Sequence, residues 1–146
     1  MAKTRKATAR DLPAIYELVR ELAIFEKAED QLKATLEDYQ RDFTAGVFEA
    51  VVLEDANEIC GMVLFYLTYS TWRGKMLYLE DFVVAERHRR CGYGQQLFDA
   101  FIAAAHEKNC AMVKWQVLDW NEAAVKFYEK NQATIEKQWW NGKIIF

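Results

Sequence analysis

The chain has 146 residues, 52% of them hydrophobic, and a net charge of −3, which fits one domain over residues 1–146 and does not favour nucleic acid, a partner that needs a clustered basic face. Its three cysteines, Cys60, Cys91 and Cys110, are odd in number and form no C-x-x-C pair, which argues against a disulfide framework or a zinc site. No apolar run is long enough for a signal peptide or a transmembrane helix, so we expect a soluble cytoplasmic protein with no metal and no membrane partner.

The first third of the sequence predicts one short strand and two helices. Residues 4–7 can form the strand, and apolar residues recur at helical spacing from about Asp11 onward. Thr35 opens a second helix through a capping box in which Asp38 replaces the usual Glu or Gln. That helix runs to about Thr44, and Gly46 ends it.

Three strand-like runs follow, over residues 48–54, 59–69 and 76–84. Residues 55–57 form a turn between the first two runs, and Gly74-Lys75 breaks the chain before the third. Consecutive strands joined by short turns predict an antiparallel meander.

The rest of the chain alternates helices and strands, with a strong Asn-Gly hairpin signal near its end. We expect helices over residues 95–108 and 121–130, and strands over residues 112–118, 133–140 and 143–146. The order β-α-α-β-β-β-α-β-α-β-β predicts an α/β (α+β) fold. Its central sheet should be mixed and mostly antiparallel, with helices on both faces.

The third strand-like run carries two adjacent carboxylates, Glu80 and Asp81. Strict alternation puts them on opposite faces, Glu80 with Phe82 and Asp81 with Val83. Both faces are apolar, so at least one charge is costly unless it is paired or hydrated. A polar cleft would relieve that cost and raise the pKa of the carboxylate toward that of a useful base. A buried ion pair, or a strand that ends at Leu79, would explain the same pattern.

A basic, glycine-containing loop, Arg89 to Gly94, precedes the helix predicted over residues 95–108. Backbone N–H groups and the positive end of a helix suit a phosphate, and glycines let a ligand approach the backbone. The loop is neither a P-loop nor a good dinucleotide motif, because no Gly-Lys-Ser/Thr follows and Leu97 takes the place of the third glycine. An ordinary basic surface loop is the alternative.

The last motif is Trp120-Asn121-Glu122, followed by Phe127-Tyr128. Asn121 is a candidate N-cap, and Tyr128 lies two helical turns later on nearly the same side. This spacing places an amide and a phenol at one edge of the sheet. Taken alone, the pattern is better explained by a capped helix whose tyrosine packs in the core.

In this order, the motifs resemble the GNAT superfamily of acetyl-CoA-dependent N-acetyltransferases, particularly the diamine (spermidine/spermine) and thialysine acetyltransferases. The resemblance covers essentially the whole chain and is densest over residues 65–128. It rests on the sequences WRGK at 72–75, LYLEDF at 77–82, R-x-x-G-x-G at 89–94, VLDWNE at 117–122 and FY at 127–128.

The resemblance implies direct transfer of an acetyl group from acetyl-CoA to the primary amine of a small molecule, either a diamine or polyamine or a lysine-like amine. It implies Glu80 as general base and Tyr128 as the acid that protonates the leaving thiolate, in a homodimer without a metal. The implied CoA contacts are Phe82, Val83, Val84, Arg89, Arg90, Cys91, Gly92, Tyr93, Gly94 and Asn121. The residues implied to line the amine groove are Glu26, Trp72, Asp81 and Trp120.

The sequence departs from the family pattern at several positions. Ser70 stands where polyamine enzymes carry an acidic residue, which weakens the case for a long polyamine. Arg90 and Cys91 replace small residues in the loop, and Gln132 stands where a glycine commonly follows the last helix. The main alternative function is a catalytically silent acyl-CoA-binding or regulatory module. An enzyme that uses another nucleotide is disfavoured by the missing P-loop lysine.

Overall fold

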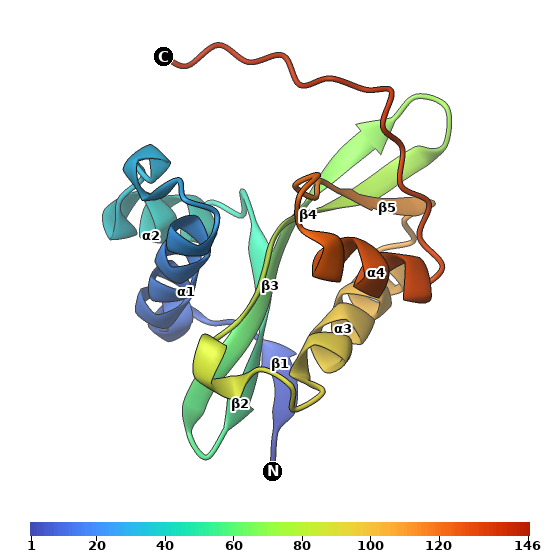
Figure 1. Cartoon of the computed structure of the whole chain (residues 1–146). Helices are drawn as coiled ribbons and strands as arrows, with labels where there is room; N and C mark the ends of the chain where they lie inside the picture. The colour runs from blue at the N-terminus through green and yellow to red at the C-terminus, as the bar shows by residue number, and fades with distance from the viewer. The chain divides into compact units, whose positions relative to one another are not determined.

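The computed structural model describes residues 1–146, which divide into two compact units, residues 1–115 and 116–146 (Figure 1). The first unit contains the strands β1 (Lys3–Lys6), β2 (Glu49–Asp55), β3 (Glu58–Ser70), β4 (Gly74–Val84) and β5 (Met112–Trp115). Its α-helices are α1 (Leu12–Phe25), α2 (Leu36–Thr44) and α3 (Tyr93–Glu107). None of the helices is both long and apolar enough to cross a membrane.

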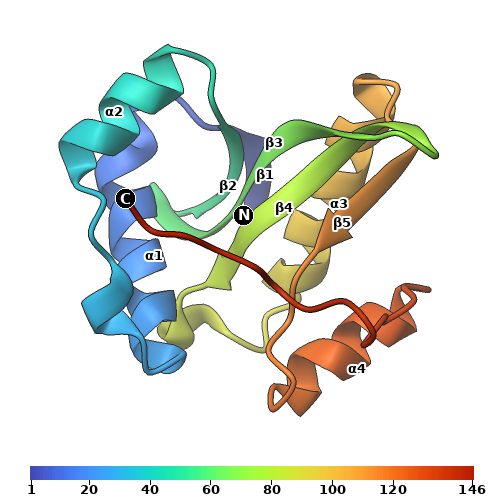
Figure 2. The ribbon, with the colours of Figure 1, turned by 90° about the horizontal axis from the view of Figure 1, so that it is seen from above.

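The five strands form one sheet in the order β1-β2-β3-β4-β5. The first four pair antiparallel with their neighbours, and β5 pairs parallel to β4. Helices α1 and α2 cover one face of this sheet, and α3 covers the other (Figures 1 and 2). The predicted mixed, mostly antiparallel sheet between two helical layers is therefore confirmed.

The local signals for the two N-terminal helices also hold. Leu12, Ile15 and Leu18 share one face of α1 and are buried against the sheet. The Thr35 side chain accepts a hydrogen bond from the backbone N–H of Asp38, whose own carboxylate accepts one from the Thr35 N–H, so the predicted capping box is formed. Satisfying both N–H groups lets α2 begin at Leu36.

On the opposite face, aromatic rings pack between the sheet and α3. Phe65 of β3 lies 5.7 Å from Phe101, and Phe82 of β4 stacks on Phe98 at 6.1 Å between ring centroids. Trp115 of β5 meets Phe98 edge-on at 5.6 Å. This core anchors β3, β4 and β5 to one helix, leaving the α1–α2 face to form the walls of a cavity.

A β-bulge interrupts the pairing of β3 with β4. Leu64 faces Asp81, but the next residue, Phe65, faces Leu79, so Glu80 is an extra residue in β4. The parallel ladder with β5 reaches its last pair, Leu79 with Trp115, next to the bulge. A bulge bends its strand and increases the local twist. We infer that β5 therefore loses its partner there, and the strand predicted over residues 112–118 ends at Trp115.

The second unit contains α4 (Glu122–Lys130) and an extended segment after it. The predicted strands over residues 133–140 and 143–146 are wrong, because neither range forms a strand. Trp140 is 94% exposed and Ile144 84% exposed. The Asn141-Gly142 signal is local, and a hairpin additionally needs cross-strand pairing and a buried face, which this segment lacks.

Gly61 of β3 is a close-approach position, a role that the sequence analysis did not assign. It faces Val84 across the ladder, and a Cβ there would lie 2.7 Å from the Val83 carbonyl oxygen and 2.9 Å from Leu97 Cδ1 of α3. An isolated glycine within a strand pattern is the sequence signal for such an approach.

We predict that Gly61→Ala lowers the free energy of unfolding by about 1–3 kcal/mol, because the added methyl group forces β4 and α3 apart. Gly142→Ala is the matched control, since a Cβ at Gly142 meets nothing within 4 Å. Urea denaturation of both variants measures the difference. Equal midpoints for the two variants would show that the contact is not tight.

Candidate functional site

The bulge brings Glu80 and Asp81 to the same face of the sheet. Both line one cavity together with Leu64, on the side covered by α1 and α2. Phe82, the expected companion of Glu80, instead points to the α3 face. The predicted separation of the two carboxylates is therefore wrong, because strict alternation does not allow for the extra residue.

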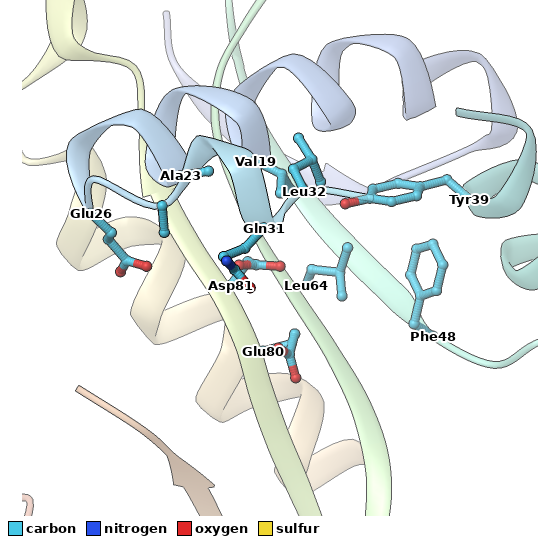
Figure 3. Close-up of a pocket in the computed structure, with 11 residues that line it drawn as sticks. Val19, Ala23, Glu26, Gln31, Leu32, Tyr39, Phe48, Leu64, Glu80 and Asp81 are labelled. Atoms are coloured by element: carbon cyan, nitrogen blue, oxygen red, sulfur yellow. The ribbon is translucent and has the colours of Figure 1, made fainter. Parts of the chain in front are cut away.

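The cavity has a volume of about 410 Å³ and is open to solvent (Figure 3). Its apolar wall comes mainly from α1, the α1–α2 connection and the sheet, and Tyr39 of α2 adds a phenol. Glu26, at the C-terminal end of α1, also reaches the cavity. Figure 3 shows the three carboxylate side chains, Glu26, Glu80 and Asp81, among the residues that line this cavity. The complete lining is Val19, Ala23, Glu26, Ala28, Gln31, Leu32, Tyr39, Phe48, Leu64, Glu80 and Asp81.

Glu80 is held by a residue that the sequence analysis missed. The Tyr66 hydroxyl of β3 donates a 2.7 Å hydrogen bond to Glu80 Oε1. The Tyr66 ring stacks on Tyr78, its partner across the ladder, at 5.4 Å between centroids. This stack fixes the phenol, which in turn orients the Glu80 carboxylate. The sequence alone gives no signal for this role of Tyr66, because the role depends on how β3 and β4 are paired.

Burial and nearby negative charges raise the pKa values of three groups that line the cavity. Burial raises the pKa of Asp81 to about 7, and the charges of Glu80 and Glu26 add to that effect. Burial likewise raises the pKa of Glu26. The pKa of Tyr39 rises to about 12 through burial and the nearby Asp81 charge, so its phenol is neutral at physiological pH. The expected cleft with a carboxylate of raised pKa is present, and that carboxylate is Asp81.

The glycine-containing loop leads directly into α3. Gly92 is the N-cap of α3, with φ = +79°, a left-handed conformation that glycine adopts without steric cost. No side chain caps the helix, and no atom lies within 4 Å of where a Gly92 Cβ would stand. Arg89, Arg90 and Cys91 are exposed beside it. The loop therefore offers open space and positive charge at a helix N-terminus, an arrangement that favours an anion.

Arg89 connects this loop to the end of β4 and to α1. Its Nε donates a 3.3 Å hydrogen bond to the Val84 carbonyl oxygen, and its guanidinium lies 5.5 Å from the centre of the Phe25 ring. Val83, by contrast, is buried in the core under α1. Val83, one of the residues on β4 predicted to bind the cofactor, can therefore offer a ligand only its backbone.

The remaining predicted site residues fall into two groups. Trp72 lies in the β3–β4 turn, is 91% exposed, and does not line the cavity. Trp120, Asn121 and Tyr128 belong to the second unit. There the Asn121 side chain accepts a 3.2 Å hydrogen bond from the Ala124 N–H, which confirms it as the N-cap of α4, and Tyr128 is buried beside Phe127 at 5.6 Å. The parts of these three residues in a site stay predictions.

Comparison with known proteins gives one consistent family. Residues 12–133 match the acetyltransferase (GNAT) family. A thialysine N-epsilon-acetyltransferase from Mus musculus is 34% identical over 141 residues, covering 88% of this chain and 83% of its own length. A spermidine/spermine N(1)-acetyltransferase-like protein from Homo sapiens is 30% identical over 138 residues, covering 88% of this chain and 20% of its own.

The fold is also found in solved structures. An aminoglycoside acetyltransferase from an uncultured soil metagenomic sample superposes with a TM-score of 0.82 at 22% identity. The match covers 99% of this chain and 96% of that one. At this identity the likeness supports the fold alone.

We predict that Asp81→Asn stabilises the protein at pH 8, on the order of 2–4 kcal/mol, and loses this advantage near pH 4. The pKa of Asp81 is about 7 in the folded state, above the value of about 4 in the unfolded chain, so the folded state binds the proton more tightly. The wild type therefore loses stability as pH rises from about 4 to about 7, and the variant avoids that loss.

Denaturant unfolding of both proteins across this pH range measures the difference. Glu37→Gln, which removes an exposed carboxylate outside the cavity, is the control for removing a carboxylate as such. A difference in stability between Asp81→Asn and the wild type that does not change with pH would contradict a raised pKa at Asp81.

Proposed function

The chain belongs to the acetyltransferase (GNAT) family and is an acyltransferase, and on that premise we propose that it moves an acetyl group from acetyl-CoA to one amine of a small aliphatic diamine. The observation that carries this proposal is the cavity containing Glu26, Glu80 and Asp81. Carboxylates on one part of the wall and apolar side chains on the other suit a hydrocarbon chain with cationic ends.

Electrostatics favours a diamine over an amino acid as the acceptor. The relatives include one named for thialysine, which carries a carboxylate, and one named for spermidine and spermine, which carry none. In this chain burial raises the pKa of the Asp81 carboxyl, and the charges of Glu80 and Glu26 raise it further. A carboxylate on the acceptor would add a further negative charge to this cavity, whereas a second ammonium group would offset one.

The proton of the attacking amine needs an acceptor inside the cavity. A free aliphatic amine is mostly protonated at neutral pH and cannot attack a carbonyl carbon. We propose that Glu80 and Asp81 act together as the base, with Glu80 oriented by Tyr66 and with Asp81 near the pKa that suits proton transfer. Glu26 then binds the distant ammonium group. The sequence analysis assigned the base to Glu80 alone, and this proposal adds Asp81.

The loop before α3 fits the phosphate end of the donor. The N-terminal end of α3 has no side-chain cap, and a Cβ at Gly92 would meet nothing within 4 Å. The nearest atom to a Cβ on Gly94 is Phe82 Cζ at 3.8 Å. When bound, acetyl-CoA supplies the acetyl group as a thioester with a thiolate leaving group. We propose that Arg89 to Gly94 bind its pyrophosphate and that the backbone of Phe82 to Val84, beyond the last β4–β5 pair, orients its pantetheine arm.

The second unit contributes three residues to this proposal. The family match extends to residue 133 and so includes both units, which we take as one catalytic domain. Asn121 would contact the donor, and the Tyr128 hydroxyl would give a proton to the leaving sulfur. Trp120 and Trp72 would border the amine, where an aromatic face suits an ammonium group.

The acceptor class is tested by incubating the protein with acetyl-CoA and matched pairs of amines, followed by mass spectrometry. Lysine and 1,5-diaminopentane form one pair, because they differ only in the carboxylate. We expect one added acetyl group on the diamine and at least about tenfold lower kcat/KM for lysine. Faster acetylation of lysine would contradict the diamine assignment. Binding of CoA without acetylation of any amine would favour the silent module.

The acid role of Tyr128 is tested by Tyr128→Phe. We expect kcat to fall by about 10²–10⁴, the usual range for a lost general acid, while the affinity for CoA changes little. Tyr69→Phe, which removes the hydroxyl of an exposed tyrosine near the end of β3, is the matched control. If Tyr128→Phe weakens CoA binding and keeps the rate, Tyr128 binds the donor and is not the acid.

A further inference from the structure

The turn between β2 and β3 is bonded to one residue inside the glycine-containing loop and to one residue before it. Inside the loop, the hydroxyl of Tyr93, the first residue of α3, donates a 2.6 Å hydrogen bond to Asp55 Oδ2. Before the loop, the Arg87 guanidinium pairs with Glu58. Asp55 ends β2 and Glu58 begins β3, so one four-residue turn provides both contacts. We call residues 55–58 the hairpin turn.

The loop needs such support, because its own conformation is costly. Arg90 has φ = +69°, a left-handed conformation that a residue with a side chain adopts at a cost of about 1 kcal/mol or more. Arg89 to Gly92 are exposed, so little burial offsets this cost. Strained backbone persists where the surroundings fix it. The two contacts from the hairpin turn are surroundings of this kind.

The protonation states of the bonded groups favour both contacts. The Tyr93 hydrogen bond lowers the pKa of Asp55, and the Arg87 pair lowers the pKa of Glu58, so both groups stay ionised while bonded. The bond to Asp55 raises the pKa of Tyr93 to about 12, which keeps its phenol protonated as the donor. The Tyr93 side chain is therefore engaged with Asp55, and only its backbone remains for the role in donor binding predicted from the sequence.

We propose that Asp55 and Glu58 are positioning residues for the donor, holding the loop in its phosphate-binding shape through Tyr93 and Arg87. This inference rests on the proposed use of acetyl-CoA. It differs from that proposal in assigning donor affinity to two residues that lie outside the loop. The contact crosses 38 residues of sequence, so it forms only in the folded protein.

The test compares two acetyl donors, acetyl-CoA and S-acetylpantetheine, which lacks the pyrophosphate. In Asp55→Ala we expect the KM for acetyl-CoA to rise about tenfold, the effect of one lost charge-assisted hydrogen bond, with little change in kcat. The KM for S-acetylpantetheine should not change. Glu58→Ala should show the same pattern. A general loss of structure would instead affect both donors alike.

Three further variants make the test specific. Asp55→Asn keeps an oxygen that can accept from Tyr93 and should restore most of the affinity. Tyr93→Phe should match Asp55→Ala, and the double variant should be no worse than either single one, because both remove the same bond. Tyr16→Phe is the matched control, since it removes a 2.8 Å phenol hydrogen bond to the Ala34 carbonyl oxygen, outside the loop.

The results separate this inference from the proposed function. If the wild type acetylates no amine, the proposed function fails. The role of the hairpin turn is then tested by the rise in melting temperature that CoA produces in each protein. The role predicts a smaller rise in Asp55→Ala than in the wild type and Asp55→Asn, and equal rises would overturn it. If the wild type is active but the KM for acetyl-CoA is unchanged in Asp55→Ala and Tyr93→Phe, the positioning role is wrong. Additive effects in the double variant would also overturn it.

Discussion

The position of one extra residue in β4 determines most of what this protein can do. Pairing with β3 is continuous on both sides of Glu80, so the bulge costs only local strand geometry. It turns two neighbouring carboxylates to the same side and coincides with the end of the β4–β5 ladder. The cavity thus gains two of its carboxylates next to the point where the β4–β5 ladder ends. Without the bulge, one carboxylate would lie among the aromatic rings under α3, where nothing compensates a charge.

That arrangement places a destabilising cluster of charges against a well-packed core. The raised pKa of Asp81 is a measure of stability lost at neutral pH, and it arises from burial first and from Glu80 and Glu26 second. The opposite face of the sheet offsets this cost with Phe65, Phe101 and their neighbours. Groups whose pKa is shifted by burial and by like charges are common at functional sites. A cation that binds beside such carboxylates relieves the repulsion between them. The raised pKa of Asp81 therefore supports the proposal that an ammonium group binds there.

The sequence predicts the secondary elements well because their signals are local. The Thr35 capping box, the periodicity of α1 and the turns of the meander each depend on residues a few positions apart. The bulge has no such signal, since it depends on the register between β3 and β4. The bonds from Tyr66 to Glu80 and from Tyr93 to Asp55 were missed for the same reason, because they join different elements. The false hairpin near Gly142 is the converse case, a strong local signal that the rest of the chain does not support.

The two halves of the site are held in place by different parts of the fold. The cavity is shaped by α1, the α1–α2 connection and the bulged part of β4, whereas the loop before α3 is fixed by the hairpin turn and by the packing of Gly61 against Leu97. Under the proposed function, residues that determine the acceptor can therefore change without disturbing the loop that we propose for the donor. The relatives are named for different acceptors, thialysine in one case and spermidine and spermine in the other, and such independence allows this difference. In this chain the strand β4 joins the two regions, because Asp81 faces the cavity and Val84, three residues later, is bonded to Arg89 of the loop.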